Sequence, residues 1–387
     1  MNSGVKSAAF LLSDLEPGAS GVGDYATMLC EALDNEGVAT KLISIRDQSP
    51  EYLEEPTGNK VRIPSAWSDA KRRQKLEEIF NAFKPDWVSL QYSAYGVSTN
   101  GMAAEIKHWL PHLPATTHRH IMFHETWVGA SPQAPLKHRV IGWFQRRSLQ
   151  QFLAWFTPSC VHSHASVYRA LIERKLGINC NFLPLFSNLP INKETISDDR
   201  DSLINHRLGL ASDRRRSEWV VGIFGSIFPE WNPAEVLSRL IKLGKEHARE
   251  IHLVGIGRHG AGAVEALKVI QEDFSESMKF TELGPVSPSE ASQLIAGLDY
   301  SIAMTPLEVF GKSSSARTVR EHGIPLIVPR AETPLWKRLG VTEPDDALII
   351  PLDDRFEKGV IETRREIPRW TRTDVARRLI GDLSESV

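Results

Sequence analysis

The stretch from Ala303 to Val328, AMTPLEVFGKSSSARTVREHGIPLIV, is the most informative part of the 387-residue chain. Both of its ends are short apolar runs typical of buried strands. Its middle is polar and contains a lysine followed by three serines, Lys312 to Ser315. Because serine hydroxyls accept hydrogen bonds from the N–H groups of a helix start, we expect a helix to begin there. The pattern predicts strand, loop, helix, turn and strand, as in an α/β domain.

The predicted helix start has the chemistry of a phosphate site. A helix N-terminus carries partial positive charge and directs N–H groups at an anion. Gly311 allows the backbone to approach a ligand closely. Lys312 adds a full positive charge, and Glu308 places a carboxylate nearby. We interpret the stretch as a diphosphate cradle beside an acid. A capped helix that binds nothing is the alternative.

These residues resemble the donor-binding signature of retaining glycosyltransferases of the GT-B fold, the group 1 or family 4-like enzymes. That family has a Glu-x-Phe-Gly segment before a helix that ends in a Gly-x-Pro turn, and here the turn is Gly323 to Pro325. In the family the glutamate contacts the donor sugar, while the Phe-Gly backbone and the helix start hold sugar and phosphate. The resemblance implies these donor-side positions: Glu308, Phe310, Gly311, Lys312, Ser313, Ser314 and Ser315.

Charged residues of that family are missing at their expected positions. A second glutamate, which binds ribose, corresponds to Ala316, or to Thr318 if the loop carries two extra residues. An arginine and a lysine that neutralise the diphosphate correspond to about Ser226 and Trp231. We expect Lys312 to replace part of that missing charge, and the chain to be a divergent member.

The first half of the chain repeats the strand–loop–helix pattern. Ala8 to Leu12 predicts a strand, which a glycine-containing loop joins to a helix. Ligands of open α/β sheets bind at the carboxyl ends of strands. The resemblance places Gly21 and Gly23 of this loop near the donor phosphate, and Asp24 and Tyr25 on the acceptor side.

Two later strands also end in polar residues. One ends at Tyr92, and the other, His120 to Phe123, ends at His124 and Glu125. The resemblance implies that His124 contacts the donor sugar and that Tyr92 and Glu125 face the acceptor. A structural role for His124 stays open. Because neighbours on an extended chain point to opposite sides, we expect His124 and Glu125 to diverge.

The second half contains two glycine turns after predicted strands. One includes Gly225 and Ser226, and the other is Gly255 to Gly260, which has the Gly-x-Gly-x-x-Gly spacing of dinucleotide-binding proteins. A dinucleotide-dependent enzyme is therefore one alternative. The resembled glycosyltransferases have the same turn at this place, and the resemblance puts Gly225, Ser226, Gly257 and Val286 near the donor nucleotide.

A basic helix is predicted from Arg139 to Phe152, with aromatic residues between its charges. We interpret it as an amphipathic surface helix, and weak contact with a membrane surface stays an alternative. After it, Ala154 to Pro158 is predicted to be a strand.

Length and composition indicate two ordinary α/β domains. The net charge is −2, so no basic excess points to nucleic acid. Three cysteines without metal-type spacing, and a start without a signal peptide, predict a cytoplasmic protein without disulfides, metal or cofactor. A polar run sets the predicted domains at residues 1–188 and 189–369, with a helix at 370–387 returning to the first. The sequence does not indicate an oligomeric state.

The predicted fold is GT-B-like: two doubly wound, Rossmann-like α/β domains facing a central cleft. The predicted function is metal-independent transfer of a sugar, with retention, from a nucleoside-diphosphate donor to an acceptor. His124, Glu308 and Lys312 form the predicted catalytic group. The missing charges favour a second alternative, a non-catalytic protein of this fold that binds a nucleotide sugar or a glycan. Neither the donor nor the acceptor is identified by the residues.

Overall fold

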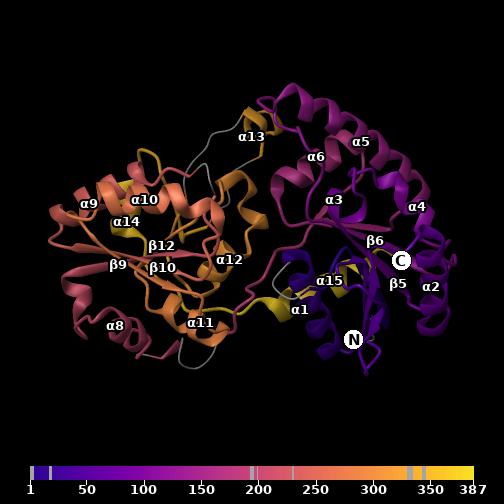
Figure 1. Cartoon of the computed structure of the whole chain (residues 1–387), viewed down its shortest axis with the longest axis horizontal. Helices are drawn as coiled ribbons and strands as arrows, with labels where there is room; N and C mark the ends of the chain where they lie inside the picture. The colour runs from indigo at the N-terminus through magenta and orange to yellow at the C-terminus, as the bar shows by residue number, and fades with distance from the viewer. Residues whose placement is uncertain are drawn as a thin grey trace. The chain divides into compact units, whose positions relative to one another are not determined.

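A computed structural model describes residues 4–16, 20–191, 196–197, 199–228, 231–328, 334–341 and 346–387. The chain divides into two compact units. Unit 1 comprises Met1–Leu185, Glu332–Thr342 and Arg372–Val387, and unit 2 comprises Phe186–Ala331 and Glu343–Thr371. Two segments from late in the sequence thus belong to the unit formed by the first half (Figure 1).

Unit 1 is built on a sheet with the strand order β3-β4-β2-β1-β5-β6-β7-β8. Its strands are β1 (Ser7–Leu12), β2 (Ala39–Asp47), β3 (Leu53–Glu54), β4 (Lys60–Pro64), β5 (Trp87–Tyr92), β6 (His118–Phe123), β7 (Cys160–Ser163) and β8 (Asn181–Phe182). Neighbouring strands are parallel except for β3, which pairs antiparallel with β4. The chain leaves β1 toward one edge and resumes at β5 on the other side, so the strand order reverses between β1 and β5.

Helices cover both faces of this sheet. They are α1 (Gly21–Asn35), α2 (Asp69–Phe83), α3 (Ala94–Val97), η1 (Ala103–Glu105), α4 (Ile106–Trp109), α5 (Leu136–Phe156), α6 (Ser166–Leu176), α13 (Pro334–Leu339) and α15 (Arg372–Glu385). One face packs its apolar side chains, such as Leu11, Leu90 and Phe123, into a core with α2, α4 and α5. The late helix α15 lies beside α1, and the late helix α13 packs against α6 through Leu335 and Leu339 (Figure 1).

Unit 2 has a second parallel sheet, with the order β11-β10-β9-β12-β13-β14. Its strands are β9 (Glu218–Phe224), β10 (Glu250–Ile256), β11 (Lys279–Gly284), β12 (Tyr300–Ile302), β13 (Leu326–Val328) and β14 (Ile349–Pro351). Its helices are α8 (Ser202–Leu208), η2 (Arg214–Arg216), α9 (Ala234–Glu246), η3 (Ala261–Ala263), α10 (Val264–Asp273), α11 (Pro288–Ala296), η4 (Leu307–Lys312), α12 (Ser314–Glu321) and α14 (Phe356–Glu362). Here the strand order reverses between β9 and β12.

The two doubly wound α/β units confirm the predicted class of each domain. The stretch that predicted strand, loop, helix, turn and strand begins directly after β12 and contains η4, α12, a turn at Gly323 and β13. One predicted strand is wrong, because Ala154 to Phe156 are the last residues of α5 and Thr157 caps that helix in a left-handed conformation. The short apolar run is part of the last turn of a helix, and the strand begins only at Cys160.

A buried ion cluster holds the beginning of unit 2 together. Arg214 is 1% exposed and donates to Asp299 at 2.5 Å, to the Asn205 side chain at 2.7 Å and to the Gly297 carbonyl at 2.5 Å. Asp299 also accepts the backbone N–H of Val220 at 2.8 Å. The guanidinium therefore links α8 and the end of α11 to the entry of β9 and β12.

Replacing this arginine tests the cluster. Arg214→Ala removes the buried hydrogen bonds to Asn205, Gly297 and Asp299. Asp299 keeps Arg215 and the Val220 N–H as partners, so we expect a loss of about 2 kcal/mol in the free energy of unfolding of unit 2. Arg216→Ala, on the exposed side of the same turn, is the matched control and is expected to cost under about 0.5 kcal/mol. Urea unfolding monitored by tryptophan fluorescence would measure both. Equal unfolding midpoints for the two variants would contradict the assignment.

Candidate functional site

The residues singled out in the sequence follow strands at the two points where strand order reverses. In unit 1 these strands are β1 and β5, with β6 next to β5. In unit 2 they are β9 and β12. At such a point the loops from neighbouring strands leave toward opposite faces of the sheet, and ligands of open α/β proteins bind in the gap. Each unit therefore has one topologically favoured binding edge.

In unit 2 this edge is formed by two glycine turns. Gly225 follows β9 with φ of +85°, and Gly257 follows β10 with φ of +91°. The Gly225 N–H donates to the Ile256 carbonyl at 3.1 Å, and the Gly257 N–H donates to the Gly284 carbonyl at 2.9 Å. Positive φ is nearly free only for glycine, so these residues let the backbone turn sharply at the strand ends. Ser226 and Val286, both expected near the nucleotide, lie beside these turns, exposed and half-buried respectively.

The start of α12 lies against the first of these turns. Ser313 is the N-cap, and its hydroxyl accepts from the Ala316 N–H at 3.2 Å. The hydroxyls of Ser313 and Ser315 are 3.2 Å apart. A Cβ atom on Gly225 would lie 3.4 Å from the Cβ of Ser315, so the turn lies close to the helix start with room for little more than a methyl group between them. The edge thus gathers hydroxyls and the positive end of a helix dipole within one small surface.

The other predicted donor residues differ in accessibility. Lys312 is exposed at the end of η4, and Ser314 is exposed in the first turn of α12. Phe310 is buried and belongs to the core. Thr318 is 1% exposed, with its hydroxyl 3.1 Å from that of Ser187, so it faces the interior of unit 2. The backbone of Glu308 lies in η4, while its side chain is outside the described part of the structure.

In the Gly255 to Gly260 turn, which has the dinucleotide-binding spacing, the side chain of His259 occupies the space over the first glycine. His259 is 5% exposed, and its Nδ1 lies 2.8 Å from the Gly225 carbonyl oxygen. Its Nε2 lies only 2.5 Å from where a Cβ on Gly255 would be. The imidazole therefore occupies the space over Gly255, where a dinucleotide-binding turn leaves the backbone open to a pyrophosphate. Gly255 makes room for a side chain of the same turn.

In unit 1 the glycine loop opens α1. The hydroxyl of Ser20, the N-cap, accepts from the Gly23 N–H at 3.1 Å. Gly23 is buried, and a Cβ there would lie 2.6 Å from the Asp14 carbonyl oxygen. Gly21 is exposed, and a Cβ there would meet nothing within 4 Å. The close approach of α1 to the strand end thus requires glycine at Gly23, whereas Gly21 is open to a ligand.

His124 lies just beyond the end of β6, in a closed aromatic and polar environment. It is 7% exposed, with the Tyr25 ring 5.3 Å away in edge-to-face contact and the His164 ring at 5.2 Å. Its Nε2 lies 2.9 Å from Oε1 of Gln91. Burial lowers the pKa of His124 to about 3, so the imidazole is neutral at physiological pH. Neutral imidazole is a hydrogen-bonding group, one nitrogen donating and the other accepting.

The remaining acceptor-side residues separate into exposed and buried ones. Glu125 points outward, and its carboxylate accepts from the Ser93 hydroxyl at 3.3 Å, so it diverges from His124 as predicted. Asp24 is half-buried on α1. Tyr92 is 1% exposed, and Tyr25 is 3% exposed. These two tyrosines are interior residues of unit 1, since Tyr92 packs on Phe123 at 5.1 Å between ring centroids.

A row of polar residues that no sequence motif identifies leads away from His124. Ser89, Gln91, His120 and His162 are all buried, on the face of the sheet opposite the main apolar core. Their signal in the sequence is alternation along two strands. In β5, WVSLQY, the polar residues alternate with apolar ones, and in β6 together with the residue after it, HRHIMFH, histidines recur at even spacings. Period-two alternation normally marks a solvated face, so it does not by itself distinguish this buried polar row.

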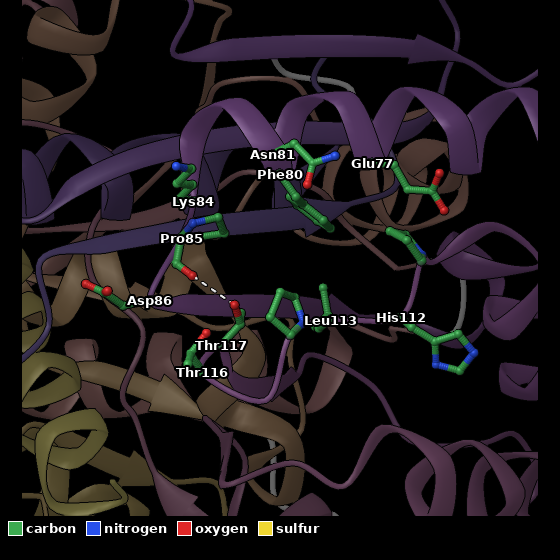
Figure 2. Close-up of a pocket in the computed structure, with 12 residues that line it drawn as sticks. Glu77, Phe80, Asn81, Lys84, Pro85, Asp86, His112, Leu113, Thr116 and Thr117 are labelled. Atoms are coloured by element: carbon green, nitrogen blue, oxygen red, sulfur yellow. Dashed lines mark hydrogen bonds between the residues drawn. The ribbon is translucent and has the colours of Figure 1, made fainter.

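A pocket of about 400 Å³ lies at the other edge of the unit 1 sheet (Figure 2). It is lined by the end of α2 and by residues that precede β5 and β6, such as Lys84, Asp86 and Leu113. Thr117 closes one side by donating to the Pro85 carbonyl at 3.2 Å. Because these are amino ends of strands, the pocket is not part of the predicted site.

A family match falls within unit 1. Residues 20–176 match the family model described as the Glycosyl transferase 4-like domain. The matched region begins at the N-cap of α1 and includes the strand ends that carry Tyr92, His124 and Glu125. Comparison with curated proteins found no significant match.

Solved structures resemble the chain over its whole length. The Anabaena protein HepE, in complex with UDP and glucose, is 13% identical with a TM-score of 0.60, covering 98% of this chain and 100% of that one. The catalytic domain of starch synthase IV from Arabidopsis thaliana, bound to ADP and acarbose, is 12% identical with a TM-score of 0.59, covering 99% and 98%. UDP-GlcNAc 2-epimerase from Methanocaldococcus jannaschii is 11% identical with a TM-score of 0.51, covering 98% and 99%. The chain therefore has the GT-B fold, and the family match with these neighbours supports a GT-B glycosyltransferase.

Proposed function

We propose that the chain transfers a sugar from a nucleoside-diphosphate donor to an acceptor with retention of anomeric configuration. The observation that carries the proposal is the binding edge of unit 2, where the Gly225 and Gly257 turns and the start of α12 meet. Neighbours of the same fold hold UDP or ADP. A helix start and glycine turns are the means by which α/β proteins bind phosphate.

The diphosphate leaves as an anion, so its charge must be stabilised in the transition state. Backbone N–H groups at the start of α12, the hydroxyls of Ser314 and Ser315, and the ammonium group of Lys312 are suited to this task. Fixed donors of this kind stabilise developing charge without a metal ion. Lys312 is proposed to take over from the arginine and lysine that the family has near Ser226 and Trp231.

In the proposed reaction the bond between the anomeric carbon and the diphosphate breaks, and a bond from the acceptor oxygen forms on the same face of the sugar. The acceptor proton passes to the departing phosphate oxygen. His124 and Glu308 are proposed to hydrogen-bond sugar hydroxyls during this step. This internal-return route needs no protein nucleophile.

The proposed location is the cytoplasm. The three cysteines are buried free thiols, which supports a reducing compartment.

Two alternatives differ in what they require. A dinucleotide-dependent enzyme needs an open turn at Gly255, and His259 occupies that space. A binding protein without catalysis needs only the phosphate cradle, and the buried position of Thr318 favours it because no ribose-binding side chain lies there. Release of free sugar from the donor separates a transferase from a binding protein.

An additional proposal concerns unit 1, where α5 presents an apolar face to solvent. Four large side chains are 50–73% exposed: Leu136, Val140, Trp143 and Phe144. The helix has no acidic residue. Beside it, a pocket of about 210 Å³ is lined by four cations, Arg139, Arg146, Lys175 and Arg338. Amphipathic helices of this composition bind anionic membrane surfaces, and we propose weak attachment of this kind. No helix of the described residues has the length and apolarity needed to cross a bilayer.

Nucleotide binding is the first test. We expect one nucleoside diphosphate to raise the unfolding midpoint with or without EDTA, because a ligand that binds the folded state stabilises it. Lys312→Ala removes a charged donor and is expected to weaken binding about tenfold. Lys358→Ala is the control, since it removes a lysine whose side chain is 74% exposed on α14. Stabilisation by NAD(H) alone would instead identify a dinucleotide enzyme.

The matching nucleotide sugar then tests the chemistry. Incubation without acceptor is expected to release free sugar slowly, with the donor's anomeric configuration in the first product seen by NMR. An inverted product contradicts retention. A new epimer of the nucleotide sugar would assign the activity of the epimerase neighbour, and unchanged donor despite tight binding would favour the binding protein.

The two loop glycines separate a structural role from a ligand role. Gly23→Ala pushes a Cβ into the Asp14 carbonyl, so we expect a loss of about 1–3 kcal/mol in stability. Gly21→Ala has open space and is expected to leave stability unchanged or slightly higher. If Gly21 approaches the donor phosphate, its alanine variant binds the nucleotide sugar more weakly at unchanged stability. Equal destabilisation by both substitutions would refute the close-approach argument.

Membrane attachment is measured by co-sedimentation with vesicles. We expect binding to vesicles of phosphatidylcholine and phosphatidylglycerol in equal amounts, and not to phosphatidylcholine alone. Arg139→Gln and Arg146→Gln should each weaken binding about fivefold, corresponding to about 1 kcal/mol per charge. Replacing Trp143 and Phe144 with serine should abolish it, while Ile367→Ser, at an 84% exposed position of unit 2, should not matter. Equal binding to both vesicle types would contradict the proposal.

A further inference from the structure

A continuous row of hydrogen bonds crosses the unit 1 sheet from His124 to the C-terminal helix. Its members are His124, Gln91, Ser89, His120, His162 and Asp382, at successive distances of 2.9, 2.8, 2.7, 3.0 and 2.9 Å. The first five are at most 7% exposed, while Asp382 reaches the surface on α15. We call this row the polar ladder.

The sheet register explains why the ladder is continuous. Ser89 lies opposite His120 across β5 and β6. Across β6 and β7, His162 lies opposite Met122, which is two residues from His120 on the same face of the strand, so the two histidines are diagonal neighbours. Residues two apart on a strand share a face, so Ser89 and Gln91 project to the same side. The ladder residues therefore line the sheet face that α15 covers, away from the main apolar core.

The three histidines of the ladder are neutral. Burial lowers the pKa of His120 and His162 below the usual value and that of His124 to about 3. A neutral imidazole has one N–H and one lone pair, so a bond accepted by one nitrogen requires the other to donate. In each ladder histidine, the direction of one hydrogen bond therefore fixes the direction of the other. The same holds for the side-chain amide of Gln91 and the hydroxyl of Ser89.

Asp382 fixes that direction because a carboxylate only accepts. His162 must donate to it from Nε2, which leaves Nδ1 as an acceptor. The Cys160 thiol, 3.6 Å from the same Nδ1, is kept protonated because burial raises its pKa, and it agrees with this assignment. His120 then donates from Nε2 to His162 and accepts from the Ser89 hydroxyl at Nδ1.

The directions of the remaining hydrogen bonds, from Ser89 through Gln91 to His124, follow in the same way. Ser89 accepts from the Gln91 amide nitrogen, which turns the Gln91 carbonyl toward His124. His124 must then carry its proton on Nε2, so its Nδ1 is a lone-pair acceptor. No partner for this Nδ1 occurs among the described side chains. Without the carboxylate every bond could reverse, and Nδ1 of His124 would become a donor.

We infer that Asp382 is a positioning residue that sets the tautomer of His124 through the polar ladder. His124 is thereby prepared to accept a hydrogen bond at Nδ1 from a ligand hydroxyl. The hydroxyl belongs to the donor sugar if the proposed function holds, and this part rests on it. The tautomer itself does not depend on the reaction.

The test is imidazole ¹⁵N spectroscopy on the full chain labelled at histidine, without ligand at neutral pH. Long-range ¹H–¹⁵N spectra distinguish a protonated from an unprotonated ring nitrogen, and single histidine substitutions assign the signals. We expect His120, His124 and His162 in the Nε2–H form. Asp382→Ala is expected to shift all three toward the Nδ1–H form. Glu385→Ala, which removes an exposed carboxylate of the same helix, should change none.

Ser89→Ala provides a second, milder break and decides the question if Asp382→Ala does not fold. It should free His124 to populate both tautomers while His162 stays in the Nε2–H form. Asp382→Glu, which keeps an acceptor on α15, should restore the wild-type signals in part. His124 remaining in the Nε2–H form in every folded variant would overturn the inference.

A functional readout follows only if donor cleavage is found. Asp382→Ala should then slow donor hydrolysis about tenfold, the effect of one lost hydrogen bond. Affinity for the nucleoside diphosphate, which lacks the sugar, should stay unchanged. A chain that cleaves no donor but shows the tautomer changes would refute the proposed function and leave the ladder's role intact.

Discussion

The reversal of strand order in each sheet is the constraint on which the candidate site depends. Parallel strands place all their carboxyl ends at one edge, and loops that leave toward opposite faces open a gap between neighbouring strands. In unit 1 the gap lies between β1 and β5, and in unit 2 between β9 and β12. The residues at these points are brought there by topology alone. This is why chains only 11–13% identical can share the arrangement.

The proposed anion site of unit 2 consists mainly of backbone groups. Gly225 and Gly257 adopt left-handed conformations that most residues avoid, and α12 begins directly beside the first turn. N–H groups held by a helix need no reorganisation when charge develops, and this preorganisation is what makes them effective in a dry site. A cradle of this kind depends less on arginine and lysine side chains, so the proposed transfer does not require the two charges that the resembled family has near Ser226 and Trp231. The proposed role of Lys312 follows from the same reasoning.

The sequence predicts what periodicity and turn chemistry control, and fails where tertiary packing decides. Serines before an apolar-periodic segment correctly placed the start of α12, and the two-domain α/β class followed from alternating strands and helices. The sequence did not show that Tyr92 points inward, because one residue of register separates a strand tip from the core. It also did not show that Thr318 is buried, because packing decides which face of the helix α12 is covered. Ala154 to Phe156 form the end of α5, because a short apolar run fits a buried helix as well as a strand. The packing of α13 on α6 joins residues far apart in sequence, and no local pattern predicts it.

The polar ladder raises a separate question of cost. Hydrophobic residues of similar volume would fill the same face of the sheet without the desolvation that buried polar groups require. The ladder avoids that penalty only because each buried donor in it meets an acceptor. This requires all the hydrogen bonds of the row to point the same way along it. Asp382 lies at the surface, where a carboxylate is inexpensive, and it selects the direction for residues that have no contact with solvent. A buried imidazole otherwise has two tautomers of similar energy. Choosing one of them from α15 gives His124 a defined hydrogen-bonding role at the strand tip, which a local contact with Gln91 alone would not impose, since an amide can turn either way.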